Sequence, residues 1–305
     1  MKLAPFTLDE CKEFFEQKGI AMSLYDLTEC YMVMGGIPYY LNYFRQGKSL
    51  AQNIDMLFFS RNARLASEFQ RLFGSLFTNP VDHMAIVRLL AQRHTGYTRD
   101  DIARNLSVSS GGSLSKMLEA LAASDFITTY HPFGKSRKEV WYKLTDFFCQ
   151  FYLRFIDNQQ VTDEAFWLHN QNTPRLNTWR GLAFEQLCFS HVAKIKKALG
   201  IEGVASAESA WIVRGDEEKA GAQMDMLIDR ADRVVNMCEM KFLSKAFEPS
   251  ARDEQTIRER VATLQEHLSF KHSIHTTLVT TVGLKPGMHS GIFQQVVTME
   301  ALFAK

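Results

Sequence analysis

Two acidic residues and a lysine near position 240 have the types and spacing of a hydrolytic site. Asp225 lies in the apolar run Met224–Ile228, and Glu239 and Lys241 lie two residues apart in the next run, Val234–Phe242. Side chains alternate along a β-strand, so Glu239 and Lys241 are expected on one face, where the neighbouring strand can also bring Asp225. These three residues are predicted to be catalytic.

A third carboxylate, Glu185, lies on a helix predicted before the strands. Two carboxylates about 4 Å apart repel each other by roughly 4 kcal/mol at an effective dielectric constant of 20, so such a group needs protons or a cation. Hard cations such as Mg²⁺ prefer oxygen ligands. Mg²⁺ or Mn²⁺ held by Glu185, Asp225 and Glu239 could activate a water and stabilise charge on a phosphate. Lys241 could orient the water or neutralise developing charge.

The order of these residues resembles the active-site signature of the PD-(D/E)XK nuclease superfamily. Asp225 is followed by Glu239-Met240-Lys241, after the helix that carries Glu185. The resemblance covers about residues 179–281. It implies a DNA-associated, Mg²⁺-dependent module that hydrolyses phosphodiesters. The same charges could instead form a solvated salt-bridge stripe, or belong to an inactive nuclease fold that binds DNA or a protein partner.

Hydrophobic periodicity predicts the elements that would position this site. A long helix is expected from Trp179 to about Leu199, and the segments expected after it are strands near 204–214, 222–230 and 233–242, a charged helix near 251–268, and a strand at 275–281. The tight turn at 230–233 predicts a mixed, partly antiparallel sheet. On the charged helix, Arg252, Arg258 and Arg260 alternate with acidic residues, which favours a solvated face over a substrate-binding one.

Residues 81–155 have the order of a winged helix-turn-helix, with three short helices followed by a hairpin. Lys116 on the third helix is a candidate phosphate contact, and the hairpin turn adds Lys135, Arg137 and Lys138. The third helix carries few side chains that read bases. DNA contact and docking onto protein therefore both stay open for this domain.

The remaining segments are a helical region over residues 1–80 and a polar linker over 156–178, which places the nuclease-like domain at 179–305. Capping residues predict helix starts at Thr7 and Ser23. An apolar helix is expected over 55–78. The aromatic side chains between 39 and 77 favour a buried core over a ligand site.

A second resemblance covers nearly the whole chain. The segments Pro5–Leu8 and Tyr31–Leu41, then the winged helix and Gly181–Glu185, run in the order of a prokaryotic (archaeal-type) AAA+/STAND-type ATPase family. In that family a P-loop ATPase precedes a helical lid, a winged helix and a nuclease-like C-terminal domain. No G-x-x-x-x-G-K-[ST] motif occurs here. The chain is therefore expected to lie downstream of an ATPase core, to hydrolyse no ATP itself, and to work with a P-loop ATPase partner or a missing ATPase domain.

Composition limits the class of protein. Lys and Arg number 35 and Asp and Glu 34, for a net charge of +1, which argues against a uniformly basic nucleic-acid binder. A hydrophobic content of 46% argues against a disordered chain. No run of about 18 apolar residues predicts a membrane span, and five scattered cysteines without a CxxC indicate reduced thiols in a cytoplasm. We therefore expect a cytoplasmic α+β multidomain protein of undetermined oligomeric state.

Overall fold

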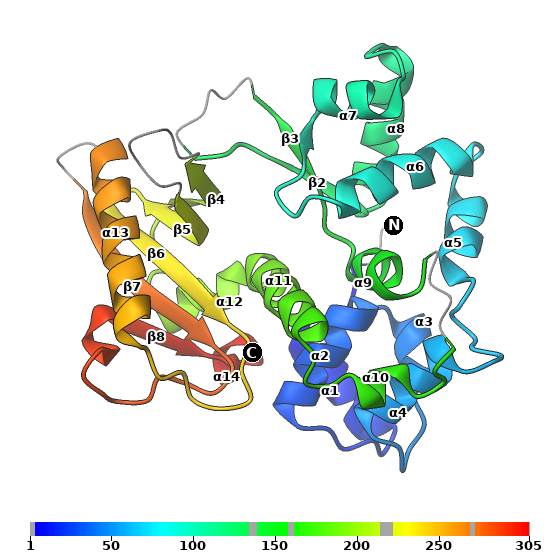
Figure 1. The fold of residues 1–305 in the computed structure, drawn as a ribbon, viewed down its shortest axis with the longest axis horizontal. Helices are drawn as coiled ribbons and strands as arrows, with labels where there is room; N and C mark the ends of the chain where they lie inside the picture. The colour runs from blue at the N-terminus through cyan, green and yellow to red at the C-terminus, as the bar shows by residue number, and fades with distance from the viewer. Residues whose placement is uncertain (1–3, 134–138, 158–161, 214–221, 269–271, 305) are drawn as a thin grey trace. The chain divides into compact units, whose positions relative to one another are not determined.

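The computed structural model describes residues 4–133, 139–157, 162–213, 222–268 and 272–304 (Figure 1). The chain forms two compact units, one of residues 1–130 with 137–179 and one of residues 131–136 with 180–305. A three-stranded sheet and a five-stranded sheet accompany the helices, so the predicted α+β class with a mixed sheet is confirmed. Over the described ranges, no helix is both long and apolar enough to cross a membrane.

The first unit begins with short helices whose ends follow local capping rules. These are α1 (Leu8–Gln17), α2 (Leu24–Met34), α3 (Pro38–Leu41), α4 (Leu50–Ile54), the π-helical turn η1 (Asp55–Phe59) and α5 (Glu68–Leu76). Thr7 and Glu10 form the predicted capping box, and the Ser23 side chain caps α2. Gly36 has a φ of +69°, and a Cβ there would lie 2.3 Å from the carbonyl oxygen of Phe6. Glycine is thus required at this turn.

The single helix predicted over 55–78 is wrong, because the chain leaves the helix after η1. Ser60 is extended, with φ −65° and ψ 156°. The following turn lets the Leu65 N–H donate to the Leu57 carbonyl at 2.9 Å and buries the Leu65 side chain completely. Tertiary burial of one side chain therefore overrides a continuous helical pattern.

The middle of the chain combines helices with a small antiparallel sheet. Its elements are α6 (Pro80–Ala91), β1 (Tyr97–Thr98), α7 (Arg99–Leu106), α8 (Gly112–Ala123), β2 (Ile127–Tyr130) and β3 (Trp141–Leu144), with the strands in the order β1-β3-β2. The Thr98 side chain caps α7, as its spacing from Asp101 predicted. Leu114, Leu118 and Leu121 are buried on one side of α8, which confirms the predicted apolar face.

Aromatic rings in contact with one another form much of the first unit's core. Phe151 and Phe155 of α9 (Phe147–Phe155) contact Trp167 of α10 (Phe166–His169), with ring centroids 5.2 and 5.3 Å apart. Trp167 is fully buried although it lies in the predicted polar linker. The aromatic residues of η1 and α5 are also buried, so their predicted role as core is confirmed.

The second unit is built on the five-stranded sheet. Its elements are the C-terminal part of α11 (Pro174–Ser190), then α12 (Val192–Ala198), β4 (Ser206–Val213), β5 (Ala222–Arg230), β6 (Val234–Lys241), α13 (Ala251–His267), β7 (Ser273–Thr280), the 3₁₀ turn η2 (Ser290–Ile292), β8 (Gln295–Thr298) and α14 (Met299–Leu302). The strand order is β4-β5-β6-β7-β8. The first two pairings are antiparallel and the last two are parallel. The predicted order of helix, three strands, helix and strand is confirmed.

The long helix predicted to reach Leu199 is interrupted at His191. The Ser190 hydroxyl donates to the Leu187 carbonyl at 2.8 Å, and the His191 ring lies 3.1 Å from the same oxygen. Side chains that bond to a nearby carbonyl compete with the helical backbone. The result is two helices, α11 and α12, in place of one.

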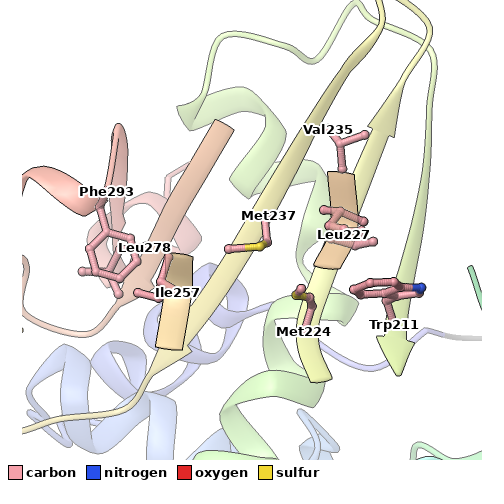
Figure 2. Packing of buried hydrophobic residues seen from close by; sticks show 9 residues of the cluster. Trp211, Met224, Leu227, Val235, Met237, Ile257, Leu278 and Phe293 are labelled. Atoms are coloured by element: carbon pink, nitrogen blue, oxygen red, sulfur yellow. The ribbon is translucent and has the colours of Figure 1, made fainter. Parts of the chain in front are cut away.

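One face of the five-stranded sheet packs against α13 (Figure 1). Figure 2 shows side chains of the buried cluster between them, which come from β4, β5, β6, β7 and α13 and from Phe293, before β8. Its members are Trp211, Met224, Leu227, Val235, Met237, Ile257, Leu264, Leu278 and Phe293. This core fixes the sheet and α13 relative to each other, and both elements contribute side chains to the site described next.

Candidate active site

A tight hairpin of β5 and β6 carries three of the four predicted site groups. Met226 pairs with Cys238 and Leu227 with Met237, and Asp225 and Glu239 are the residues that come directly after the Met226–Cys238 pair on the two strands. The ladder with β4 is irregular at the same place. Ser209 pairs with Leu227 and Trp211 with Met224, which leaves Asp225 and Met226 opposite Ala210 alone. Such a bulge re-aims side chains and is common beside active sites.

Asp225 is a partly buried carboxylate in negatively charged surroundings. Its Oδ2 accepts the backbone N–H of Met240 at 2.8 Å. Burial, followed by the charges of Glu239 and Glu185, raises the pKa of Asp225 to about 8, against the lowering effect of the Met240 N–H. A carboxyl that is this costly to ionise is one that a proton or a cation would stabilise.

Glu239 is held by two cations that come from different elements. Its Oε1 lies 2.8 Å from the Lys241 Nζ, and its Oε2 lies 2.5 Å from a guanidinium nitrogen of Arg260 on α13. The Glu239 side chain is only 13% exposed. Both carboxylate oxygens are therefore already paired with positive charge.

Lys241 is a fixed cation at this site. Burial acts to lower its pKa, but the charge and hydrogen bond of Glu239, with the charge of Asp225, outweigh burial and raise the pKa above its usual value. The ammonium also lies over the Phe247 ring, 5.8 Å from its centroid. Lys241 is thus suited to neutralising or orienting charge, and a base would have to come from another group.

Glu185 comes from α11, on a different element from the other acidic residues. Its charge contributes to the raised pKa of Asp225 and to that of the buried thiol of Cys188. The structure therefore brings the four predicted residues Glu185, Asp225, Glu239 and Lys241 into one electrostatic cluster within the second unit.

The donor atoms of this cluster are of the types that bind a divalent metal ion, but their arrangement is not that of a metal site. Asp225 and Glu185 supply the oxygen donors that Mg²⁺ or Mn²⁺ prefers. Glu239 supplies another, but Lys241 and Arg260 hold both of its oxygens. Across the described part of the chain, no group of three or more His, Cys, Asp or Glu side chains is arranged to hold a metal ion. The positive charges of Lys241 and Arg260 beside Glu239 would oppose the binding of a metal ion there.

Arg260 was not among the predicted site residues. The sequence favoured a solvated face for it, and the structure corrects this because Arg260 pairs with Glu239. Arg258 does lie on the exposed side, where it pairs with Glu254. A usable signal was present: Arg260 follows the buried Ile257 by three residues and precedes the buried Leu264 by four, so it shares the core stripe of α13.

The predicted nucleic-acid contacts belong to other segments. Lys116 is exposed on α8 in the first unit. Lys135, Arg137 and Lys138 lie outside the residues that the structure describes.

Comparisons with known proteins give little guidance. No family model matches the chain, and none of the curated proteins matches it. Among solved structures, the crystal structure of protein VC1899 from Vibrio cholerae is similar over 98% of this chain, with 11% identity and a TM-score of 0.27. The chain spans 59% of the length of that protein. A similarity this low carries no argument about fold or function.

Proposed function

We propose that the chain is a DNA-associated, nuclease-like module that hydrolyses phosphodiesters with Mg²⁺ or Mn²⁺. The observation that carries this proposal is Asp225, a partly buried carboxyl whose pKa is raised to about 8 by burial and by the charges of Glu239 and Glu185. Strongly perturbed carboxyl groups with identified charged neighbours cluster at functional sites. The positions of Asp225 on β5, Glu239 on β6 and Glu185 on the preceding α11 also agree with the PD-(D/E)XK pattern that the sequence resembles.

Each site residue has a separate role in this proposal. Asp225, Glu239 and Glu185 would hold the metal, which supplies an activated water and charge stabilisation for the phosphate. Lys241, kept protonated by Glu239, would orient the attacking water or stabilise negative charge as it develops. The Met240 N–H fixes one oxygen of Asp225 and so directs the other.

The first unit supports the DNA-associated part of the proposal. The order α6, β1, α7, α8, β2, β3 with an antiparallel β1-β3-β2 sheet is the order expected of a winged helix-turn-helix. Lys116 is exposed on α8, the helix that would approach DNA, and would contact phosphate. We propose that any ATP dependence comes from a P-loop ATPase partner or from an ATPase domain outside this sequence, because the sequence has no P-loop motif.

A second candidate function is a catalytically inactive module with the same fold that binds DNA or protein. The observation that favours it is the pairing of both Glu239 oxygens with Lys241 and Arg260. Cations that permanently neutralise a ligand carboxylate would leave a nuclease fold without its metal.

One experiment separates the two functions. The protein is incubated with plasmid and linear DNA in Mg²⁺, in Mn²⁺ and in EDTA, beside Asp225→Asn and Lys241→Gln. A nuclease is expected to cleave only with metal and to lose cleavage in both variants. Cleavage that both variants retain would indicate contamination and reject the proposal. DNA binding without cleavage, with an affinity that falls steeply as salt rises, would establish the binding module.

A further inference from the structure

The two cations paired with Glu239 differ in position: Lys241 is on the same strand, whereas Arg260 is on a separate helix. Lys241 is two residues away on the same strand, so their side chains share one face of β6. Arg260 reaches Glu239 from α13, across 21 residues of chain. Its side chain is 24% exposed, so the guanidinium has access to water if it leaves the carboxylate.

Arg260 also occupies the oxygen that a metal would need. The Glu239 Oε1 is taken by Lys241 at 2.8 Å, so Oε2 is the oxygen whose partner comes from another element. A divalent cation bound beside Asp225 would repel the guanidinium and attract the same oxygen. The divalent cation and the guanidinium would therefore compete for the negative charge of Glu239.

From this competition we infer that Arg260 is a latch on the site: it holds Glu239 in the metal-free protein and is displaced when a divalent cation binds. This inference rests on the proposed function and adds its regulation. The site would stay closed until the concentration of the cation is high enough to displace the guanidinium. Arg260 is then a positioning residue that sets the metal threshold.

Replacing Arg260 should change the metal affinity in the opposite direction to the change expected if Arg260 only supported the structure. Removal of a competitor strengthens the binding of what it competes with, whereas removal of a structural support weakens it. An ion pair of about 1 kcal/mol, the upper end for partly exposed pairs, corresponds to about a fivefold change in affinity. Loss of Arg260 should therefore tighten metal binding about fivefold.

The test is Mn²⁺ binding by the full chain, measured by titration calorimetry without DNA. Arg260→Gln is expected to bind Mn²⁺ about fivefold more tightly than the wild type. Arg260→Met, which keeps an apolar stem beside Ile257 and Leu264, should show the same gain. Arg258→Gln is the matched control on the same helix, since it pairs with Glu254, and should leave the affinity unchanged.

The outcomes distinguish the latch from the proposed function. Mn²⁺ binding that Asp225→Asn abolishes but that neither Arg260 variant tightens would overturn the latch and leave the metal site standing. If neither the wild type nor the Arg260 variants bind Mn²⁺ at a site that depends on Asp225, the proposed nuclease function fails, and the latch fails with it. Loss of folding in both Arg260 variants would make Arg260 a structural residue and would also reject the latch.

Discussion

Each unit has an aspartate shielded from water, Asp55 almost completely and Asp225 in part, and the two have opposite surroundings. Asp55 of η1 accepts the backbone N–H groups of Trp167 and Leu168 at 2.7 and 3.1 Å, where α10 begins. Asp225 of β5 accepts the Met240 N–H and faces the charges of Glu239 and Glu185. Burial raises the pKa of both carboxyl groups.

The difference between these aspartates is that Asp55 stabilises the fold, whereas Asp225 is a candidate for a functional role. At Asp55 two backbone donors compensate for the lost water and join η1 to α10, so the carboxylate stabilises the fold. At Asp225 two neighbours, Glu239 and Glu185, add negative charge that the Met240 N–H and the charge of Lys241 only partly offset, which costs stability. The same residue type is thus a structural link in one unit and a candidate ligand in the other.

The largest expected effect is on catalysis. Asp225→Asn should lower the rate of Mg²⁺-dependent DNA cleavage by at least about 100-fold, because it removes a charged ligand at the centre of the carboxylate group. The rate is measured on linear DNA under single-turnover conditions. Asp229→Asn, four residues along the same strand, is the control and should keep the wild-type rate. Equal losses of cleavage rate in Asp225→Asn and Asp229→Asn would contradict a specific role for Asp225.

Replacement of Asp55 should instead damage the fold. Asp55→Ala leaves the N–H groups of Trp167 and Leu168 without their acceptor and is expected to lower the free energy of unfolding of the first unit by about 3 kcal/mol. Urea unfolding followed by tryptophan fluorescence measures this. In a Trp211→Phe background, the remaining tryptophans all belong to the first unit.

Mn²⁺ affinity provides the cross-check for Asp55. Asp55→Ala should leave that affinity unchanged at a temperature where the protein is folded. The exposed Glu164 is a suitable control, since its alanine variant should change stability by less than about 0.5 kcal/mol. An Asp55 variant that stays as stable as the wild type would contradict a structural role for this carboxylate.

In EDTA, the stability of the second unit should depend on pH through Asp225. The native state keeps the Asp225 proton up to about pH 8, whereas an unfolded aspartate loses it near pH 4. Between these values the native state binds more protons, so the stability of the second unit should fall as pH rises from about 4 to about 8. Asp225→Asn should flatten this slope and stabilise the metal-free protein at pH 8 by about 1–2 kcal/mol.

Trp211 fluorescence reports on this transition, because Trp211 lies in the core of the second unit. The three other tryptophans are replaced by phenylalanine only if their signal overlaps. A slope that persists unchanged in Asp225→Asn would assign the titration to another group.

The smallest expected effect concerns Lys116. If α8 contacts a phosphate, Lys116→Gln should weaken DNA binding a few-fold and reduce the slope of log affinity against log salt by about 0.9. Fluorescence anisotropy with a short duplex at several salt concentrations measures both quantities. Lys12→Gln on α1 is the matched control. A slope identical to that of the wild type would exclude a phosphate contact by Lys116.

Local signals in the sequence predicted much of this structure. The Thr7 and Ser23 caps, the apolar face of α8 and the strands β4 to β7 all follow from residues near one another in the chain. Capping and periodicity act within a few residues, so they are readable without tertiary contacts. Asp225, Glu239 and Lys241 can be predicted as site residues for the same reason, because their spacing places them on two adjacent strands.

Features that depend on distant residues were not predictable in this way. The burial of Trp167 comes from α9 aromatics and from Asp55, which is 112 residues away. The bulge at Asp225 depends on how β4 pairs with β5. Strand β8 pairs with β7 in parallel, so no hairpin turn marks it in the sequence. Arg260 meets Glu239 only once α13 has packed on the sheet. In each case tertiary packing decided between local alternatives.

The tight turn between β5 and β6 also bears on the order of folding. Arg233 adopts a φ of +67° there, and Asp225, Glu239 and Lys241 lie on the two strands that the turn joins. A short loop closes at little entropic cost, so hairpins form within microseconds, whereas parallel pairing of β6 with β7 must wait for the α13 crossover. We therefore expect the nascent hairpin to juxtapose two like charges before the core that buries them exists, so that divalent ions would speed the refolding of this unit.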